Sequence, residues 1–232
     1  MNELLKKTAE SQISRAKELF KELTAQLEQD INKGNISTRA SELTEETLIK
    51  AGVCLDKCIN LYSEAKGFPE STSLYFPIAK DKPSFDEKTN KPEIKKLITA
   101  NQKVYDILLT HQPFIDTKNS VLSEIQKENR EKHRKLTLQD IKVVDERISF
   151  NGPGGGVTWS RTGVRFGNGV SINGVPINPA TQLPAFTPPT HKLTINKIVT
   201  INFQGTNVDV IKVCKEAIDK VEAVTKDFIT LS

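Results

Sequence analysis

The spacing of apolar residues changes twice along this chain of 232 residues, and these changes limit the folds open to it. Before about residue 135, apolar residues recur every three or four positions, as on an amphipathic helix. After residue 136 the spacing shifts towards two positions, as on a β-strand, and over 207–232 the helical spacing returns. We therefore predict an α+β fold with a helical bundle domain over 1–135, a β-rich module over 136–206 and a C-terminal packing helix over 207–232.

The first predicted helix runs from Glu3 to about Lys33 without an internal Pro or Gly. Its apolar residues alternate by four and three positions, which gives a continuous stripe along one side. Gly34 and Asn35 favour a helix end, because glycine readily adopts the left-handed conformation that often closes a helix. The predicted stripe consists of Ala9, Ile13, Ala16, Phe20, Leu23 and Leu27.

Three more helices complete a predicted bundle of about four. Ser41 or Thr44, each followed by acidic residues, favours the start of the second. Pro92 favours the start of the third, which extends to about Pro113. The fourth covers about 116–135 and ends in a run of mixed charges typical of a solvated helix face.

The segment 66–91 breaks the helical pattern with prolines and is predicted to be a long loop. Loops of this length are uncommon unless they are functional or disordered. Several aromatic residues argue against disorder and favour packing over the helices, with a partner-binding loop as the alternative. These residues are Phe68, Tyr75, Phe76 and Phe85.

A Gly-Val-x-apolar unit occurs four times within 156–178 and predicts short strands joined by tight turns. The Asn173-Gly174 pair is typical of a two-residue hairpin turn. A proline-rich arm over 176–191 and a strand over 193–203 follow. Strands this short need cover from another sheet, helix or chain. The four units begin at Gly156, Gly163, Gly169 and Gly174.

Charge is distributed unevenly. The chain has 33 basic and 29 acidic residues, a net charge of +4, but residues 151–206 contain four cations and no carboxylate. A sparsely charged β region is the simpler interpretation, and contact with an anion or nucleic acid is the alternative. The four cations are Arg161, Arg165, Lys192 and Lys197.

No residue pattern predicts catalysis, a cofactor or a metal. The glycine-rich stretch 151–156 lacks the Gly-Lys-Ser/Thr of a phosphate-binding loop. Cys54 and Cys58 stand four apart on one helix face and are better explained as buried residues than as half of a zinc site. Three cysteines give no disulfide framework, and His111, His133 and His191 stand singly without an identifiable catalytic partner.

Cations and aromatic rings alternate between Trp159 and Phe166, with Arg161 and Arg165 between them. This pattern is compatible with a base-stacking surface for single-stranded nucleic acid, although Trp159 is equally suited to a small core. The last helix carries a stripe that includes Val210, Val221 and Phe228 and is wide enough to require a docking surface. We therefore consider all seven residues as candidate interaction residues.

The chain has a helical part followed by a β ribbon that is rich in Gly, Asn and Thr and free of carboxylates. In this general composition and order it resembles bacteriophage tail, baseplate or connector subunits. The leading hypothesis is a non-enzymatic structural or assembly subunit that completes its core against copies of itself or other structural proteins. The alternatives are a nucleic-acid-associated module and an enzyme with a site under 66–92. No apolar run is long enough for a membrane span and the N-terminus lacks signal-peptide character, so we expect synthesis in a cytosol and use there or in a virion.

Overall fold

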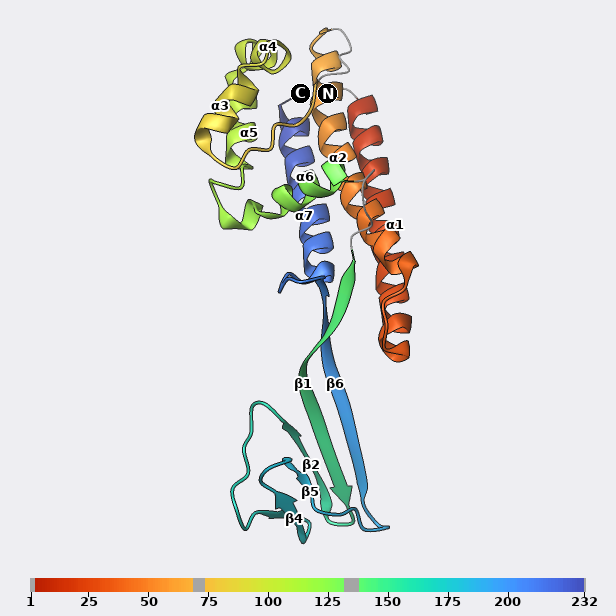
Figure 1. The fold of residues 1–232 in the computed structure, drawn as a ribbon. Helices are drawn as coiled ribbons and strands as arrows, with labels where there is room; N and C mark the ends of the chain where they lie inside the picture. Colours follow the sequence, from red (N-terminus) through yellow and green to blue (C-terminus); the bar gives the residue numbers. More distant parts are fainter. Residues whose placement is uncertain (1–2, 69–73, 132–137, 232) are drawn as a thin grey trace. The chain divides into compact units, whose positions relative to one another are not determined.

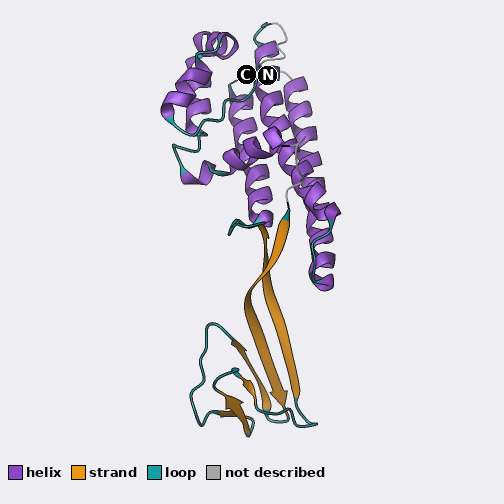
Figure 2. Ribbon diagram, in the orientation of Figure 1, coloured by secondary structure: helices purple, strands orange, loops and turns teal. Residues whose placement is uncertain are grey.

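A computed structural model describes residues 3–68, 74–131 and 138–231. The fold is α+β, with helices and two small antiparallel sheets of three strands each (Figures 1 and 2). The chain forms two compact units. Unit 1 comprises Met1–Asp140 and Phe203–Ser232, and unit 2 comprises Ile141–Asn202. No described helix is both long and apolar enough to cross a membrane.

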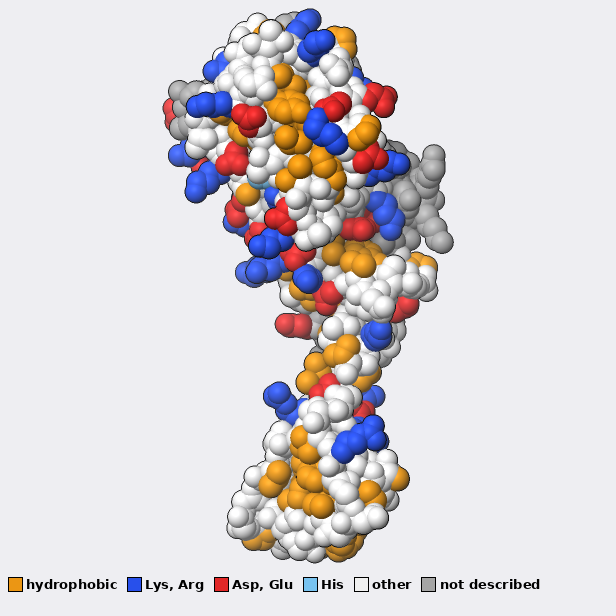
Figure 3. All heavy atoms as spheres, turned by 90° about the vertical axis from the view of Figure 1, so that its left-hand side faces the viewer, with side chains coloured by type: hydrophobic (Ala, Val, Ile, Leu, Met, Phe, Trp, Pro, Cys, Tyr) orange, Lys and Arg blue, Asp and Glu red, His pale blue; other side chains and the backbone are white. Residues whose placement is uncertain are grey.

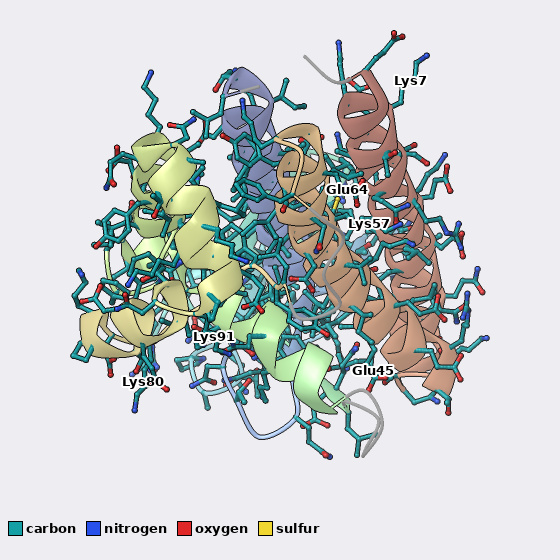
Figure 4. The ribbon with its side chains drawn as sticks, turned by 90° about the horizontal axis from the view of Figure 1, so that it is seen from above. Lys7, Glu45, Lys57, Glu64, Lys80 and Lys91 are labelled. Atoms are coloured by element: carbon teal, nitrogen blue, oxygen red, sulfur yellow. The ribbon has the colours of Figure 1, made fainter. Side chains whose placement is uncertain are left out.

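Two long helices dominate unit 1, whereas the sequence predicted a bundle of about four. They are α1 (Glu3–Lys33) and α2 (Thr38–Ala65), and the C-terminal helix α7 (Val210–Thr230) packs against both. Figure 4 shows the outside of these helices covered with charged side chains such as Lys7. The predicted stripe of α1 is correct except at one position, where Leu19 is buried in place of Phe20.

The turn between α1 and α2 is fixed by a buried carboxylate. Gly34, with φ +75°, ends α1 as predicted. However, α2 begins at Thr38 with Ser37 as its N-cap, so the prediction of a start at Ser41 or Thr44 was wrong. The carboxylate of Asp30 accepts hydrogen bonds from the Ser37 amide and hydroxyl, at 2.7 Å each. This leaves the Ser37 hydroxyl oxygen able to accept from the Ala40 amide.

The segment after α2 contains a helix that the sequence did not predict. Residues 74–79 form neither helix nor strand, and α3 (Lys82–Thr89) follows, with Asp81 as N-cap and Pro83 in its first turn. Phe76 and Phe85 are buried, as expected of aromatic residues that pack over helices, whereas Tyr75 is exposed.

The predicted third helix is two helices, α4 (Pro92–Ala100) and α5 (Gln102–Thr110). Asn101 breaks it, because its backbone is extended and its side chain instead caps α5 and donates to the Tyr62 hydroxyl at 3.0 Å. A short 3-10 turn, η1 (Thr117–Asn119), precedes α6 (Val121–Glu131). The predicted end of that helix near residue 135 lies outside the described residues.

Unit 2 contains both sheets, and the first residues of β1 and the last of β6 belong to unit 1. In the first sheet the order is β2-β1-β6 and in the second it is β3-β4-β5. The Asn173-Gly174 turn joins β3 to β4 as predicted, with φ +51° and +75°. The strands are β1 (Gln139–Gly152), β2 (Gly155–Ser160), β3 (Ser171–Ile172), β4 (Val175–Asn178), β5 (Leu183–Pro184) and β6 (Lys192–Phe203).

The repeated Gly-Val unit has three different outcomes. The third and fourth copies become β3 and β4. The first lies in β2, but it buries Trp159 and leaves Val157 exposed. The second copy, which begins at Gly163, forms no strand, because the Ser160 hydroxyl accepts the Gly163 amide and the Ser160 carbonyl accepts the Val164 amide, which curls the chain into a turn.

Candidate interaction site in unit 2

The aromatic residues predicted to bind partners lie inside the small core of unit 2. Trp159 is only 4% exposed, and its ring packs edge-on against half-buried Phe166, with 5.3 Å between ring centroids. The core also contains residues of β1, β3 and β4. The Trp159 indole therefore offers no face for stacking on a base. The other buried members are Ile148, Phe150, Ile172, Val175 and Ile177.

A buried glutamine that the sequence analysis did not single out links the segments around this core by hydrogen bonds. Gln182 is buried, with φ +59°, and its side chain accepts from the Phe166 amide at 2.7 Å. It also donates to the carbonyls of Phe166 and Pro179, and its own carbonyl accepts from the Trp159 indole at 3.2 Å. Because Gln182, Phe166 and Pro179 lie outside helices and strands, no periodic pattern could have identified Gln182.

The two predicted arginines lie in different surroundings. Arg161 is paired with Glu146 of β1, whereas Arg165 is exposed and makes no ion pair with a described residue. Beside this pair, the hydroxyls of Ser160 and Thr162 donate to Asp145 and lower the pKa of its carboxyl to about 2. Both acidic residues of unit 2 are thus engaged by neighbours.

Val210, Val221 and Phe228 are core residues of unit 1. All three are buried, and the ring of Phe228 packs against that of Tyr62 on α2 with 5.6 Å between centroids. The apolar stripe of α7 was predicted correctly, but the chain's own helices cover it. These side chains are therefore not open to a partner, and the prediction that they form an interaction surface was wrong.

Exposed apolar residues of unit 2 lie at several places, among them Val157, Val164 and Phe186, and one group lies on the ribbon formed by β1 and β6. Consecutive residues over 142–144 and 195–198 are exposed, and side chains alternate between faces along a strand, so both faces of the ribbon are open. Figure 3 shows hydrophobic side chains at the surface of this unit beside Lys and Arg, with few acidic residues. The exposed apolar residues of the ribbon are Val143 (48%), Val144 (44%), Ile195 (41%) and Ile198 (39%).

The ribbon also has open backbone edges. The order β2-β1-β6 makes β6 an edge strand, and β2 pairs with β1 only over 147–152 (Figure 1). An edge strand presents unpaired amide and carbonyl groups to any strand that can approach it. Because a two-stranded ribbon is marginally stable in water, this part of unit 2 would gain from a further strand. We define the ribbon surface as residues 141–145 of β1 and 192–200 of β6.

All of the net charge belongs to unit 2. Unit 2 has six basic and two acidic residues, and the rest of the chain has 27 of each. Figure 4 shows that the helices of unit 1 carry both basic and acidic side chains, such as Lys57 and Glu64. The ribbon surface therefore combines apolar side chains with an excess of cations. The basic residues of unit 2 are Lys142, Arg147, Arg161, Arg165, Lys192 and Lys197.

Residues considered for chemistry do not meet in one place. Cys54 and Cys58 are buried in α2, where burial raises the pKa of their thiols to about 12 and about 11. The glycine-rich stretch 151–156 is the β1–β2 hairpin. His111 is buried in unit 1 and His191 stacks on a phenylalanine of unit 2, while His133 lies outside the described residues.

A hollow of about 130 Å³ lies beside the segment 74–80. Its polar lining residues are Tyr75, Lys88, Lys91 and Gln126, and no described carboxylate, cysteine or histidine lines it. The Lys88 ammonium and the Gln126 amide both donate to the Ile78 carbonyl, so they hold the segment in place. The lining supports packing rather than acid-base chemistry.

Comparison of the chain with protein-family models, with curated proteins and with solved structures found no match to any of them.

Proposed function

We infer that this protein is a non-enzymatic structural or assembly subunit and that the ribbon surface is its docking element. The observation that carries this proposal is the exposure of apolar residues on both faces of a two-stranded ribbon with an open edge. Such surfaces are costly for an isolated protein, because apolar side chains in water favour association and open edges pair with other chains. A partner would cover both features at once.

This proposal moves the docking element away from the residues that the sequence suggested. Trp159 and the α7 stripe are covered within the chain, so they stabilise the two units rather than an assembly. Subunits of bacteriophage tails, baseplates and connectors, which the sequence resembles in texture, are proteins whose role is to be built into larger particles. A virion component is the setting we propose.

A nucleic-acid-associated module is the second candidate, and the charge of unit 2 favours it. Unit 2 has six basic residues and only two acidic ones, and Arg165 is exposed without an ion pair among the described residues. Against it, Trp159 is buried and Phe166 is half-buried, which leaves the predicted stacking surface without its rings. Binding to an oligonucleotide that weakens steeply with salt would favour this candidate.

The proposal is tested by the mass of the complex that contains the chain in its native source. We expect light scattering after tagged purification to give a mass above the 25.9 kDa of one chain. The variant Val143→Lys with Ile195→Lys should shift that mass towards one chain, because it places charge on the apolar part of the ribbon surface.

A matched control replaces two exposed apolar residues of unit 1, Val208→Lys with Ile115→Lys, and should leave the complex intact. Fluorescence of Trp159, the sole tryptophan, reports whether unit 2 stays folded in each variant. A native mass of one chain, or a complex that both double variants weaken equally, would contradict the proposal.

A further inference from the structure

We propose that the open edge of β6 receives an extended strand from a different protein, and that this strand carries acidic residues. The proposal rests on the assembly function inferred above and specifies the partner. Three observations lead to it: the position of β6 in the sheet, the side chains along it, and the distribution of charge between the two units.

The edge of β6 is long enough to be the main contact. β6 spans Lys192–Phe203, and among the strands that the structure describes it pairs with β1 alone. A strand added to such an edge is held by backbone hydrogen bonds, while the side chains on either face determine which strand is accepted. Exposed Ile195 and Ile198 lie at odd and even positions, so they present one apolar side chain on each face.

The charges along β6 are all positive. Lys192 and Lys197 are exposed, make no ion pair with any described residue, and lie on opposite faces by parity. No carboxylate occurs between Arg147 and the end of unit 2 at Asn202. Opposite charges on neighbouring strands stabilise a pair and like charges destabilise it. An incoming strand with acidic residues on both faces is therefore favoured.

The same charges argue against a second copy of this chain at the edge. A second β6 would bring another set of lysines and no acid. In β1, Asp145 and Glu146 are already engaged by Ser160 and Arg161, which leaves them poorly available to a second copy. Nucleic acid would meet the lysines but would leave the isoleucines and the backbone edge uncovered.

The experiment uses the full chain and two labelled peptides. Both have about ten residues, a strand length within the range found in proteins, and contain valine and threonine, with glutamate in one and lysine at the same positions in the other. We expect fluorescence polarisation at low salt to show the glutamate peptide binding about tenfold more tightly, and this preference to shrink at high salt. Amide hydrogen exchange should show new protection in β6 when the glutamate peptide binds.

The variant Lys192→Glu with Lys197→Glu should reverse the preference between the peptides. The control Lys96→Glu with Lys103→Glu makes the same change of charge on exposed residues of unit 1 and should leave it unchanged. Trp159 fluorescence confirms that unit 2 is folded in each. Equal binding of both peptides, binding without protection of β6, no binding of either peptide, or tighter binding of a DNA oligonucleotide to the same lysines would overturn the proposal.

Concentration-dependent protection of β6 in the chain alone, with a doubled mass, would also overturn it, because a second copy would then occupy the edge. These outcomes are separable from those that test the assembly function. A native complex that depends on Val143 and Ile195, together with no preference between the peptides, would leave the function standing and remove the acidic partner.

Discussion

Packing in unit 2 leaves no room for a larger residue at some positions. Gly152 is one example, because a Cβ atom there would lie 2.5 Å from the ring of His191, which stacks on Phe150. We predict that Gly152→Ala destabilises unit 2 by about 1–3 kcal/mol, the usual cost of overpacking. Denaturant unfolding followed by Trp159 fluorescence measures the effect. Gly167→Ala is the control, since its Cβ would meet nothing within 4 Å, and an equal loss in both variants would refute this explanation.

His111 makes unit 1 sensitive to pH. The ring is buried, its Nε2 lies 2.7 Å from a carboxylate oxygen of Asp227, and the described residues offer no partner to Nδ1. Burial lowers the pKa of His111 below its ordinary 6.5, although Asp227 opposes this shift and nearby Lys220 adds to it. The unfolded chain therefore binds a proton at a higher pH than the folded chain does.

It follows that unit 1 loses stability as pH falls below 6.5 towards the lowered pKa of His111. We predict that the variant His111→Gln loses less stability over the same pH interval, because glutamine does not titrate. Denaturant unfolding followed by circular dichroism at pH values on either side of 6.5 measures both proteins. A steeper loss in the variant would show that another group controls the pH dependence.

At the scale of elements, the α1–α2 hairpin depends on the carboxylate of Asp30. Burial alone would raise the pKa of this carboxyl, but hydrogen bonds from Ser37 and Gln26 outweigh burial and lower it. We predict that Asp30→Ala destabilises unit 1 by about 1–3 kcal/mol, because it leaves the Ser37 amide without its acceptor and loosens the N-cap of α2. Glu28→Ala, on an exposed position of the same helix, is the control for thermal unfolding, and a similar loss in the control would contradict the prediction.

Some helices and strands could be predicted from the sequence and others could not. The long periodic segments were predictable, since α1, α7 and β6 each carry a regular apolar pattern. α3 was missed because prolines were interpreted as loop signals, although Asp81 followed by Pro83 is typical of a helix start. The break at Asn101 and the role of Gln182 depend on partners distant in sequence, which no local pattern contains.

The same limit explains why the sequence pointed to residues other than the ribbon surface that we propose for docking. Apolar residues such as Trp159 and Phe228 could be recognised as surfaces in need of cover, but the sequence does not say whether the cover comes from the same chain. The ribbon surface was not predicted, because its exposed residues follow no clear apolar pattern. Val143 and Val144 are adjacent in a strand of fair quality, and their exposure follows from the small size of the sheet around them.

For the molecule as a whole, the division into units predicts that unit 1 folds without unit 2. Residues 141–202 enter and leave unit 1 at neighbouring points, because the Gln204 amide donates to the Leu138 carbonyl at 2.9 Å. A short Gly-Ser turn could therefore replace them. α7 would still cover α1 and α2, and the variant would have no net charge, since unit 1 has 27 basic and 27 acidic residues.

We predict that this variant keeps its helical circular dichroism and unfolds cooperatively, because the core of the long helices lies within unit 1. It should no longer join the native complex, because the ribbon surface is gone. Light scattering beside the full chain measures the second effect. A variant without helical circular dichroism or a cooperative unfolding transition would show that unit 1 needs unit 2 to fold. A folded variant that still enters the complex would place the docking element on the helices and remove the assigned role of the ribbon.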